Sequence, residues 1–276
     1  MSSHPDRYAV IGHPVAHSRS PEIHAAFARQ TGQTLTYDRL PAEPDAFVAT
    51  VARFFNDGGA GLNVTLPFKQ EAAVYADELS DRAARAGAVN TLARRDDGRI
   101  FGDNTDGAGL LADLVDGLGI AIENRRILIL GAGGAVRGVV PVLLNQRPAK
   151  LRVANRSIDK AQAIARDFAA MGSIDASALD DAGPGWDLVI NAISAGLHGD
   201  MPALAHTILD DAIAAYDMLY AVEPTPFMRW VQAYRPDIPT RDGFGMLVEQ
   251  AAESFALWRG VRPSTAAVIE ALRPAK

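Results

Sequence analysis

The 276-residue sequence contains no cysteine. This absence excludes disulfides, thiolate nucleophiles and thiolate metal ligands, and it is typical of a reducing compartment. Long apolar runs are missing as well, because none approaches the roughly 20 residues that a membrane-spanning helix needs. The polar N-terminus leads directly into a strand-like segment and lacks the pattern of a signal peptide. We therefore predict a cytoplasmic protein that has no membrane partner.

Dense runs of Lys or Arg are also lacking. The chain has 27 Lys and Arg against 33 Asp and Glu, which gives a formal net charge of −6. A surface that follows nucleic-acid phosphates needs clustered cations, so we expect no nucleic-acid partner. What is present is a globular composition, with 48% hydrophobic and 22% charged residues in a chain long enough for two domains.

Short apolar strands alternate with segments of helical periodicity along the chain. Strands are predicted at 8–11, 34–40, 61–64, 89–93, 99–101, 126–130, 151–155, 186–192 and 215–219. The pair at 89–93 and 99–101 is predicted to form a hairpin around Asp97–Gly98. The first helix is predicted to have Ser20 as its N-cap, and the second to open at Pro44.

This alternation indicates parallel βαβ units with helices on both faces of a sheet. The sequence therefore predicts an α/β protein with an N-terminal α/β lobe at 1–106 and a Rossmann-like, doubly wound dinucleotide-binding lobe at 107–242. Helices at 243–276 are predicted to return to the first lobe.

A glycine-rich turn links the strand at 126–130 to a helix. It consists of Gly131, Ala132, Gly133, Gly134 and Ala135. Glycines there permit a tight turn and a close approach of the backbone to a pyrophosphate, which the helix N-terminus attracts. The spacing is a variant of the usual dinucleotide motif, so a simple strand-to-helix turn is the alternative interpretation.

The next strand ends where a dinucleotide fold contacts the adenosine ribose. The residues at this point are Asn155, Arg156 and Ser157, with Lys160 one helical turn further on. A carboxylate there would favour NAD, whereas two cations and a hydroxyl suit a 2′-phosphate. The alternative is a solvated basic start of a helix, which the helix dipole would disfavour. We therefore predict NADP(H) as the cofactor.

Polar residues of the first lobe stand where its predicted strands end, which is where open α/β sheets form sites. The hydroxyl and amide side chains Ser18, Ser20, Asn63, Thr65 and Asn90 suit a polyol ring. The charged candidates for proton transfer are Lys69 and Asp106, and a hydride-carrying cofactor would leave the protein only the alcohol proton to move. The run 102–107 could also be a helix cap without chemistry.

A metal site is not expected. The carboxylates at Asp103 and Asp106 do not continue to the glutamate that a calcium loop requires, and His13, His17 and His24 are too irregularly spaced for zinc. The residues alone thus indicate an NADP-linked enzyme that acts on a small hydroxylated substrate.

Several motifs in one order make the sequence similar to a known family. They are Ser18-x-Ser20-Pro21, the segment 63–69 (NVTLPFK), 87–91 (GAVNT), 104–107 (NTDG), 131–135 (GAGGA), 155–157 (NRS), 216–220 (YDMLY) and 243–251. From end to end they resemble the shikimate dehydrogenase family. The resemblance implies reversible, NADP-dependent reduction of 3-dehydroshikimate to shikimate in aromatic amino-acid biosynthesis, with 1–106 as the substrate-binding lobe.

The resemblance also implies a role for each matching residue. Lys69 and Asp106 would be the catalytic pair, and Ser18 and Ser20 would hold the substrate carboxylate. The remaining substrate-binding residues would be Asn63, Thr65, Asn90, Tyr220 and Gln250, and Met218 and Gly243 would line the nicotinamide pocket. The chain departs from the family pattern at His13, where Asn is usual, and at Ile193, where Thr is usual.

Alternatives remain open at this point. A relative that also oxidises quinate would differ in a few contacts around Ser18, Ser20 and Thr65. A non-catalytic NADP-sensing homologue would not need Lys69 and Asp106, and a folate- or haem-pathway dehydrogenase would leave the segment 63–69 unexplained. A monomer and a homodimer are equally compatible with the sequence.

Overall fold

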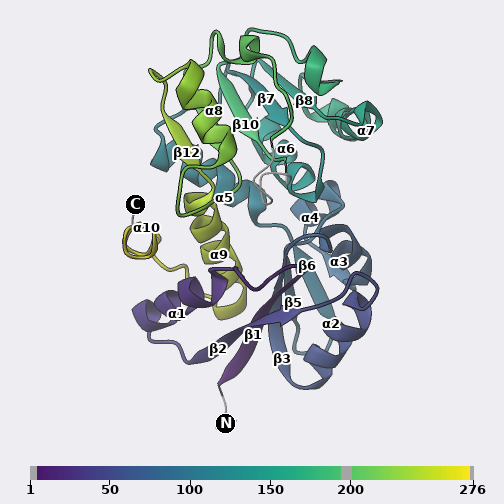
Figure 1. Cartoon of the computed structure of the whole chain (residues 1–276). Helices are drawn as coiled ribbons and strands as arrows, with labels where there is room; N and C mark the ends of the chain where they lie inside the picture. The colour runs from purple at the N-terminus through teal and green to yellow at the C-terminus, as the bar shows by residue number, and fades with distance from the viewer. Residues whose placement is uncertain (1–4, 194–200, 274–276) are drawn as a thin grey trace. The chain divides into compact units, whose positions relative to one another are not determined.

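The computed structural model describes residues 5–193 and 201–273, and they form two compact units. The first unit comprises the described residues up to Gly109 together with Leu247–Arg273, and the second comprises the described residues of Leu110–Met246. Each unit has its own six-stranded sheet (Figure 1). None of the helices in the described ranges is long and apolar enough to cross a membrane.

The sheet of the first unit is mixed, with the strand order β2-β1-β3-β5-β6-β4. Strand β1 pairs parallel with β2 and β3, whereas β5 is antiparallel to β3 and β6. The hairpin predicted around Asp97–Gly98 is confirmed, because β5 and β6 are its two strands. The strands are β1 Asp6–Gly12, β2 Leu35–Pro41, β3 Gly59–Val64, β4 Glu78–Leu79, β5 Thr91–Arg94 and β6 Ile100–Asp103.

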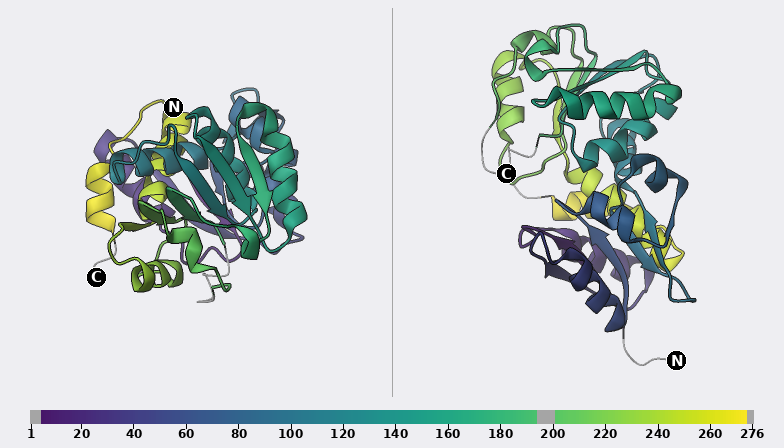
Figure 2. Two further views of the ribbon diagram at one scale, coloured as in Figure 1. Left: turned by 90° about the horizontal axis from the view of Figure 1, so that it is seen from above. Right: turned by 90° about the vertical axis from the view of Figure 1, so that its right-hand side faces the viewer.

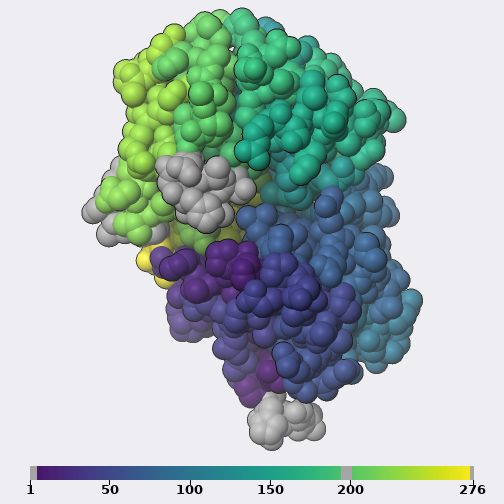
Figure 3. All heavy atoms as spheres, turned by 45° about the vertical axis from the view of Figure 1, so that its right-hand side comes forward, coloured from purple at the N-terminus to yellow at the C-terminus, as the bar shows by residue number. Residues whose placement is uncertain are grey.

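Helices cover both faces of this sheet, with α2 and α3 on one side and α1 and α9 on the other (Figure 1). Alternate residues of β1 serve the two faces, as a strand requires. Ala9 and Ile11 belong to the aliphatic cluster with Phe47 of α2, whereas Tyr8 stacks on Trp258 of α9 at 4.7 Å between ring centroids. The purple and blue segments of this unit pack side by side in the space-filling view (Figure 3).

Two helices of the first unit, α5 and α9, also contribute residues to the second unit. The helices of the first unit are α1 Ser20–Thr31, α2 Phe47–Asn56, α3 Lys69–Tyr75, α4 Asp81–Ala86, α5 Asp106–Ala112, α9 Phe244–Arg259 and α10 Ala266–Leu272.

Two predicted helix starts differ from the structure. The first helix already includes Ser20, and Arg19 is its N-cap. The Ser20 amide and hydroxyl contact the Ser18 hydroxyl, so Ser20 does not cap the helix with its side chain. The second helix begins at Phe47 rather than Pro44, because a turn closed by the Ala46 amide precedes it.

The sheet of the second unit is entirely parallel, with the strand order β9-β8-β7-β10-β11-β12. This is the 3-2-1-4-5-6 order of a doubly wound dinucleotide-binding fold, as predicted. Two strands that were not predicted, β9 and β12, form its edges. The strands are β7 Arg126–Leu130, β8 Lys150–Ala154, β9 Ile174–Ser177, β10 Leu188–Asn191, β11 Ala214–Asp217 and β12 Thr240–Asp242.

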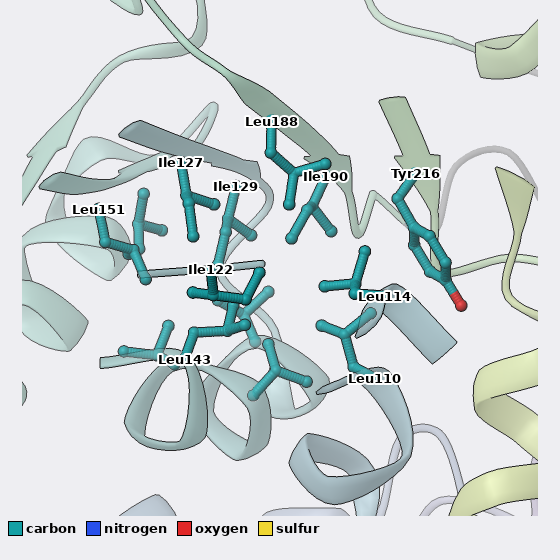
Figure 4. Packing of buried hydrophobic residues seen from close by; sticks show 14 of the residues in the cluster. Leu110, Leu114, Ile122, Ile127, Ile129, Leu143, Leu151, Leu188, Ile190 and Tyr216 are labelled. Atoms are coloured by element: carbon teal, nitrogen blue, oxygen red, sulfur yellow. The ribbon is translucent and has the colours of Figure 1, made fainter. Parts of the chain in front are cut away.

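Apolar side chains fill both faces of this parallel sheet. Ile127 and Ile129 of β7 point into one cluster, seen in Figure 4, whereas Leu128 and Leu130 point into another around Trp186. Helices α6 Gly134–Asn145 and α7 Ile158–Phe168 contribute to the first cluster, and α8 Pro226–Tyr234 contributes to the second (Figure 2). Burial on both faces explains why these strands read as continuous apolar runs in the sequence.

Candidate functional site

The first unit brings Lys69 and Asp106 together. Lys69 is the first residue of α3 and Asp106 is the first residue of α5. The Lys69 Nζ lies 2.5 Å from the Asp106 Oδ2, and the two side chains are only 12% and 6% exposed. A cation at a helix N-terminus opposes the helix dipole, so the adjacent carboxylate compensates for that position. The pair is a buried acid–base couple of the kind that proton transfer requires.

Asn90 joins this pair to neighbouring polar groups. Its Nδ2 donates to the Asp106 Oδ1 and the Thr105 Oγ1, each at 2.9 Å, and contacts the Gln250 Oε1 at 3.2 Å. Its Oδ1 accepts from the Thr105 backbone amide at 2.9 Å. Because a backbone N–H can only donate, this contact fixes which way round the Asn90 amide lies.

Asn63 lies at the end of β3, and both the oxygen and the nitrogen of its side-chain amide form hydrogen bonds. The Tyr37 hydroxyl donates to the Asn63 Oδ1 at 2.7 Å, and the Asn63 Nδ2 donates to the Ser254 Oγ at 2.9 Å. Burial raises the pKa of Tyr37, so its hydroxyl stays protonated and acts as a donor. The predicted residues Asn63, Asn90 and Gln250 therefore belong to one hydrogen-bonded network with Asp106.

Several members of this network were not predicted from the sequence. Ser254 follows Gln250 by one turn of α9. Its hydroxyl accepts from the Asn63 Nδ2, donates to the Gln250 main-chain carbonyl and contacts the Thr91 and Thr105 hydroxyls. A polar residue on the same helix face as Gln250 was the available signal. Tyr37, Thr91 and Thr105 carried no such signal, because their partners lie on other strands and loops.

Ser18, Ser20 and Thr65 lie on the segments that follow β1 and β3. The two serine hydroxyls are 3.1 Å apart, and Ser20 is buried. The Thr65 amide donates to the Ile11 carbonyl at 2.9 Å, and a Cβ at Gly12 would overlap the Thr65 methyl. The adjacent parallel strands thus place these three predicted residues at the same edge of the sheet.

A charged pair supports the turn that precedes Asp106. Arg82 binds both carboxylate oxygens of Asp103 at 2.7 and 2.5 Å, and Ser80 donates to the same carboxylate. Burial raises the pKa of Asp103, but the hydrogen bonds from Arg82 and Ser80 outweigh it and leave that pKa below its usual value. The ionised Asp103 Oδ1 then accepts from the Asn104 amide at 2.8 Å.

The glycine-rich turn of the second unit has the geometry of a phosphate cradle. Gly131 has φ of +112°, and a Cβ there would lie 2.9 Å from the Ala192 carbonyl oxygen. Gly133 is exposed, and a Cβ there would meet no atom within 4 Å. Gly134 and Ala135 begin α6, so its free N–H groups face the same turn as Gly133. This open approach to a helix N-terminus fits a pyrophosphate.

The predicted 2′-phosphate residues lie after β8 at the start of α7. Asn155 is partly buried and its Nδ2 donates to the Ser157 carbonyl at 2.9 Å, whereas Arg156, Ser157 and Lys160 are exposed. Within the described ranges neither Arg156 nor Lys160 forms an ion pair. Two exposed cations without a carboxylate partner fit a dianionic ligand.

Met218 and Gly243 also lie in the second unit, at the ends of β11 and β12. The Met218 amide donates to the Asn191 carbonyl at 2.8 Å, and the Gly243 amide donates to the Leu219 carbonyl at 2.9 Å. A Cβ at Gly243 would overlap the Met218 carbonyl, so only glycine permits this approach. Tyr220, also predicted, is partly exposed, and its ring centroid lies 6.0 Å from that of Phe244.

The two departures from the family pattern come just after β1 and β10. His13 is 44% exposed, and its backbone amide donates to the Leu66 carbonyl at 2.9 Å. Ile193 packs against the cluster around Trp186. Within the described residues, no group of three or more His, Asp or Glu side chains is placed to hold a metal ion.

Three family models match successive parts of the chain. Residues 10–92 match the family model of the shikimate dehydrogenase substrate binding domain, residues 114–198 match that of shikimate / quinate 5-dehydrogenase, and residues 243–273 match that of the shikimate 5′-dehydrogenase C-terminal domain.

Individual relatives agree with the family models. The chain is 56% identical over 274 residues to the shikimate dehydrogenase (NADP+) of Aromatoleum aromaticum, with 97% of both chains covered. It is 54% identical over 270 residues to the protein of the same name from Thioalkalivibrio sulfidiphilus, with 98% of both covered. The crystal structure of shikimate 5-dehydrogenase from Thermus thermophilus in complex with NADP(H) and shikimate is similar at a TM-score of 0.84 and 34% identity, covering 96% of this chain and 98% of that one.

Proposed function

Because the chain belongs to the shikimate dehydrogenase family, we propose that it catalyses the reversible, NADP-dependent reduction of 3-dehydroshikimate to shikimate in aromatic amino-acid biosynthesis. The observation that carries this proposal is the buried Lys69–Asp106 pair, with its 2.5 Å contact and its connection through Asn90 to Gln250. It is the arrangement that a ketone reduction needs beside the reacting oxygen.

NADPH, when bound, supplies the hydride that reaches the carbonyl carbon of the substrate. Negative charge then grows on the carbonyl oxygen, and the Lys69 ammonium stabilises it and donates a proton from Nζ. Asp106 orients that ammonium through its Oδ2. In the oxidation direction Lys69 takes the alcohol proton back.

We assign the substrate contacts to the residues that match the family motif. Asn63, Asn90 and Gln250 present amides that are already oriented by the network, so little ordering is required when the ring hydroxyls bind. Ser18 and Ser20 would hold the substrate carboxylate. Thr65 and Tyr220 complete the proposed set.

We assign the pyrophosphate to the turn 131–135 and the 2′-phosphate to Arg156 and Lys160, with Asn155 and Ser157 beside them. The exposure of the two cations supports this assignment, and so does the position of Ser157 as the N-cap of α7. Met218 and Gly243 are proposed to line the nicotinamide pocket.

The expected setting of this reaction is the cytoplasm, where NADPH and the substrate are both small dissolved molecules. We propose that the protein works there as a monomer or a homodimer. Size-exclusion chromatography with light scattering would separate these two states.

The test of the proposed function is an initial-rate assay with shikimate and with quinate, each against NADP+ and NAD+. We expect the highest kcat/KM for shikimate with NADP+. Comparable kcat/KM for quinate would instead indicate a quinate/shikimate dehydrogenase. NADP+ binding without turnover of either acid would indicate a non-catalytic sensor.

A further inference from the structure

The second unit contains a buried charged cluster that the proposed chemistry does not use. Asp113, in the π-helical turn Asp113–Gly117 that follows α5, has a side chain that is 1% exposed. Its Oδ2 accepts a hydrogen bond from the Tyr216 hydroxyl at 2.7 Å, and its Oδ1 lies 2.6 Å from the Arg241 Nη2. Arg241 also donates to the Gly117 carbonyl at 3.0 Å.

This cluster is closely packed as well as charged. A Cβ at Gly117 or at Gly245 would overlap the Asp113 carboxylate, so two glycines give the acid its space. Figure 4 shows the Tyr216 ring beside the aliphatic cluster, with its hydroxyl directed away from it. Burial and the adjacent Asp113 carboxylate hold the pKa of Tyr216 well above its usual value, so the hydroxyl remains a donor.

The partners of Asp113 are also neighbours in the sheet. Tyr216 of β11 pairs with Arg241 of β12, and Asp217 pairs with Asp242 one position further. The next residues along the two strands are Met218 and Gly243, and the Gly243 amide donates to the Leu219 carbonyl at 2.9 Å. Asp113 therefore binds the two strands immediately before the residues assigned to the nicotinamide pocket.

We propose that Asp113 is a positioning residue for the nicotinamide half of the cofactor, acting through Tyr216 and Arg241. By holding the ends of β11 and β12 in one register, it fixes the approach of Met218 to Gly243. Removing the Tyr216 hydroxyl leaves the buried carboxylate short of a hydrogen bond, and removing Arg241 leaves its charge unpaired, so either change loosens these strand ends. The proposal rests on the proposed function, because the pocket assignment comes from it.

The test compares two ligands that share one half. NADP+ carries the nicotinamide ring, whereas adenosine 2′,5′-bisphosphate carries only the half assigned to Arg156. Titration calorimetry would measure both ligands on the wild type and on the Tyr216→Phe and Arg241→Met variants. Tyr216→Phe keeps the buried ring and deletes one hydroxyl, so it tests the cluster even where Arg241→Met fails to fold.

Arg235→Met is the matched control. Arg235 has nearly the same side-chain exposure as Arg241, 23% against 22%, and it also binds a carboxylate and main-chain carbonyls in the second unit. It differs in holding the loop before β12 rather than the strand ends. Thermal melts of all variants would report the folded fraction.

We expect Tyr216→Phe and Arg241→Met to weaken NADP+ binding about tenfold and to leave the bisphosphate within about twofold of the wild type. Arg235→Met should change neither affinity. Folded variants that keep the wild-type affinity for NADP+, or that lose both ligands equally, would overturn the positioning role alone. A wild-type protein that binds neither ligand would overturn the cofactor assignment, and this proposal with it.

Discussion

The two candidate sites are built in different ways. In the first unit, the Asn90 side chain binds those of Asp106 and Gln250, and the Asn63 side chain joins them through the Asn90 main-chain carbonyl and Ser254. In the second unit, the turn 131–135 offers main-chain N–H groups and space. In a site made of linked side chains, the loss of one member affects its neighbours, whereas exposed cations act more independently of one another.

The difference follows from the two sheets. The parallel sheet of the second unit sends every strand end to one edge, where a helix N-terminus meets the turn after β7. The mixed sheet of the first unit ends β3 and β6 beside the start of β5, so side chains from several directions must satisfy one another. Mutations in each unit can test this contrast.

The largest effect is expected at Lys69, in the hydrogen-bonded site of the first unit. Lys69→Ala removes the group that takes the alcohol proton, so kcat for shikimate oxidation should fall by about 100-fold or more, with little change in the KM for shikimate. Steady-state kinetics would measure both constants. A Lys160→Ala variant, which removes an exposed lysine from the other unit, should raise the KM for NADP+ instead. A near-normal kcat for Lys69→Ala would remove Lys69 from the mechanism.

The next largest effect is expected at Arg156, in the candidate cofactor site of the second unit. Arg156→Ala deletes a charged contact to the 2′-phosphate, so the KM for NADP+ should rise roughly 10- to 100-fold while the KM for NAD+ stays near the wild-type value. Arg166→Ala is the control, because Arg166 is an exposed arginine of α7, the helix that follows Arg156. An unchanged KM for NADP+ would contradict the cofactor assignment.

The third prediction concerns how stability depends on pH, which we expect to reflect the buried imidazole of His24. His24 is fully buried and stacks on Tyr37 at 4.2 Å, and burial lowers the pKa of His24 from 6.5 to about 3. The unfolded chain therefore binds a proton that the folded chain does not, so stability falls as the pH falls from 6.5 towards 3.

Between pH 7 and pH 5 this loss should amount to about 2 kcal/mol in the free energy of unfolding. Denaturant unfolding at both pH values would measure it. His24→Leu should reduce the difference by that amount, whereas His17→Gln, at an exposed position, should preserve it. Equal pH dependence in wild type and His24→Leu would show that His24 does not titrate in this way.

The smallest effect is expected at Ser254. Ser254→Ala removes one hydroxyl from the linked network and should lower the free energy of unfolding by about 1 kcal/mol. Because the Asn63 amide loses a partner, the KM for shikimate should rise too. The exposed Ser264→Ala should change neither quantity. Wild-type values for Ser254→Ala would mean that the members of the first-unit site are not interdependent.

Local features of the fold were predictable from the sequence. The glycines at 131–134 and the cations at Arg156 and Lys160 depend on residues close in sequence, and the structure places them at a strand end and two helix starts. The strands with buried apolar runs were found for the same reason. The short edge strands β9 and β12 were missed, because they bury few residues and carry little hydrophobic signal.

Contacts between residues that are far apart in the sequence could be identified only in the folded structure. Asn63 and Ser254 are 191 positions apart, and Tyr216 and Asp113 are 103 positions apart. No periodicity or spacing reports such partners, since they depend on strand order and on how helices cross the sheets. The residues of the Lys69–Asp106 pair were recognised as candidates from their types and their places at strand ends, and the sheet order accounts for their contact.

The backbone amide of Thr105 has an effect that reaches beyond its own turn. Because this amide can only donate a hydrogen bond, it binds the Asn90 Oδ1, and the Asn90 Nδ2 must then face Asp106. Both Asp106 oxygens therefore accept hydrogen bonds, one from Asn90 and one from Lys69. A single main-chain group thereby fixes the donor that Asn90 presents to Asp106, while the Lys69 ammonium can only donate to the same carboxylate. Each turnover in the reduction direction must consequently reprotonate Lys69 from outside this network, because its amides and its carboxylate have no proton to transfer.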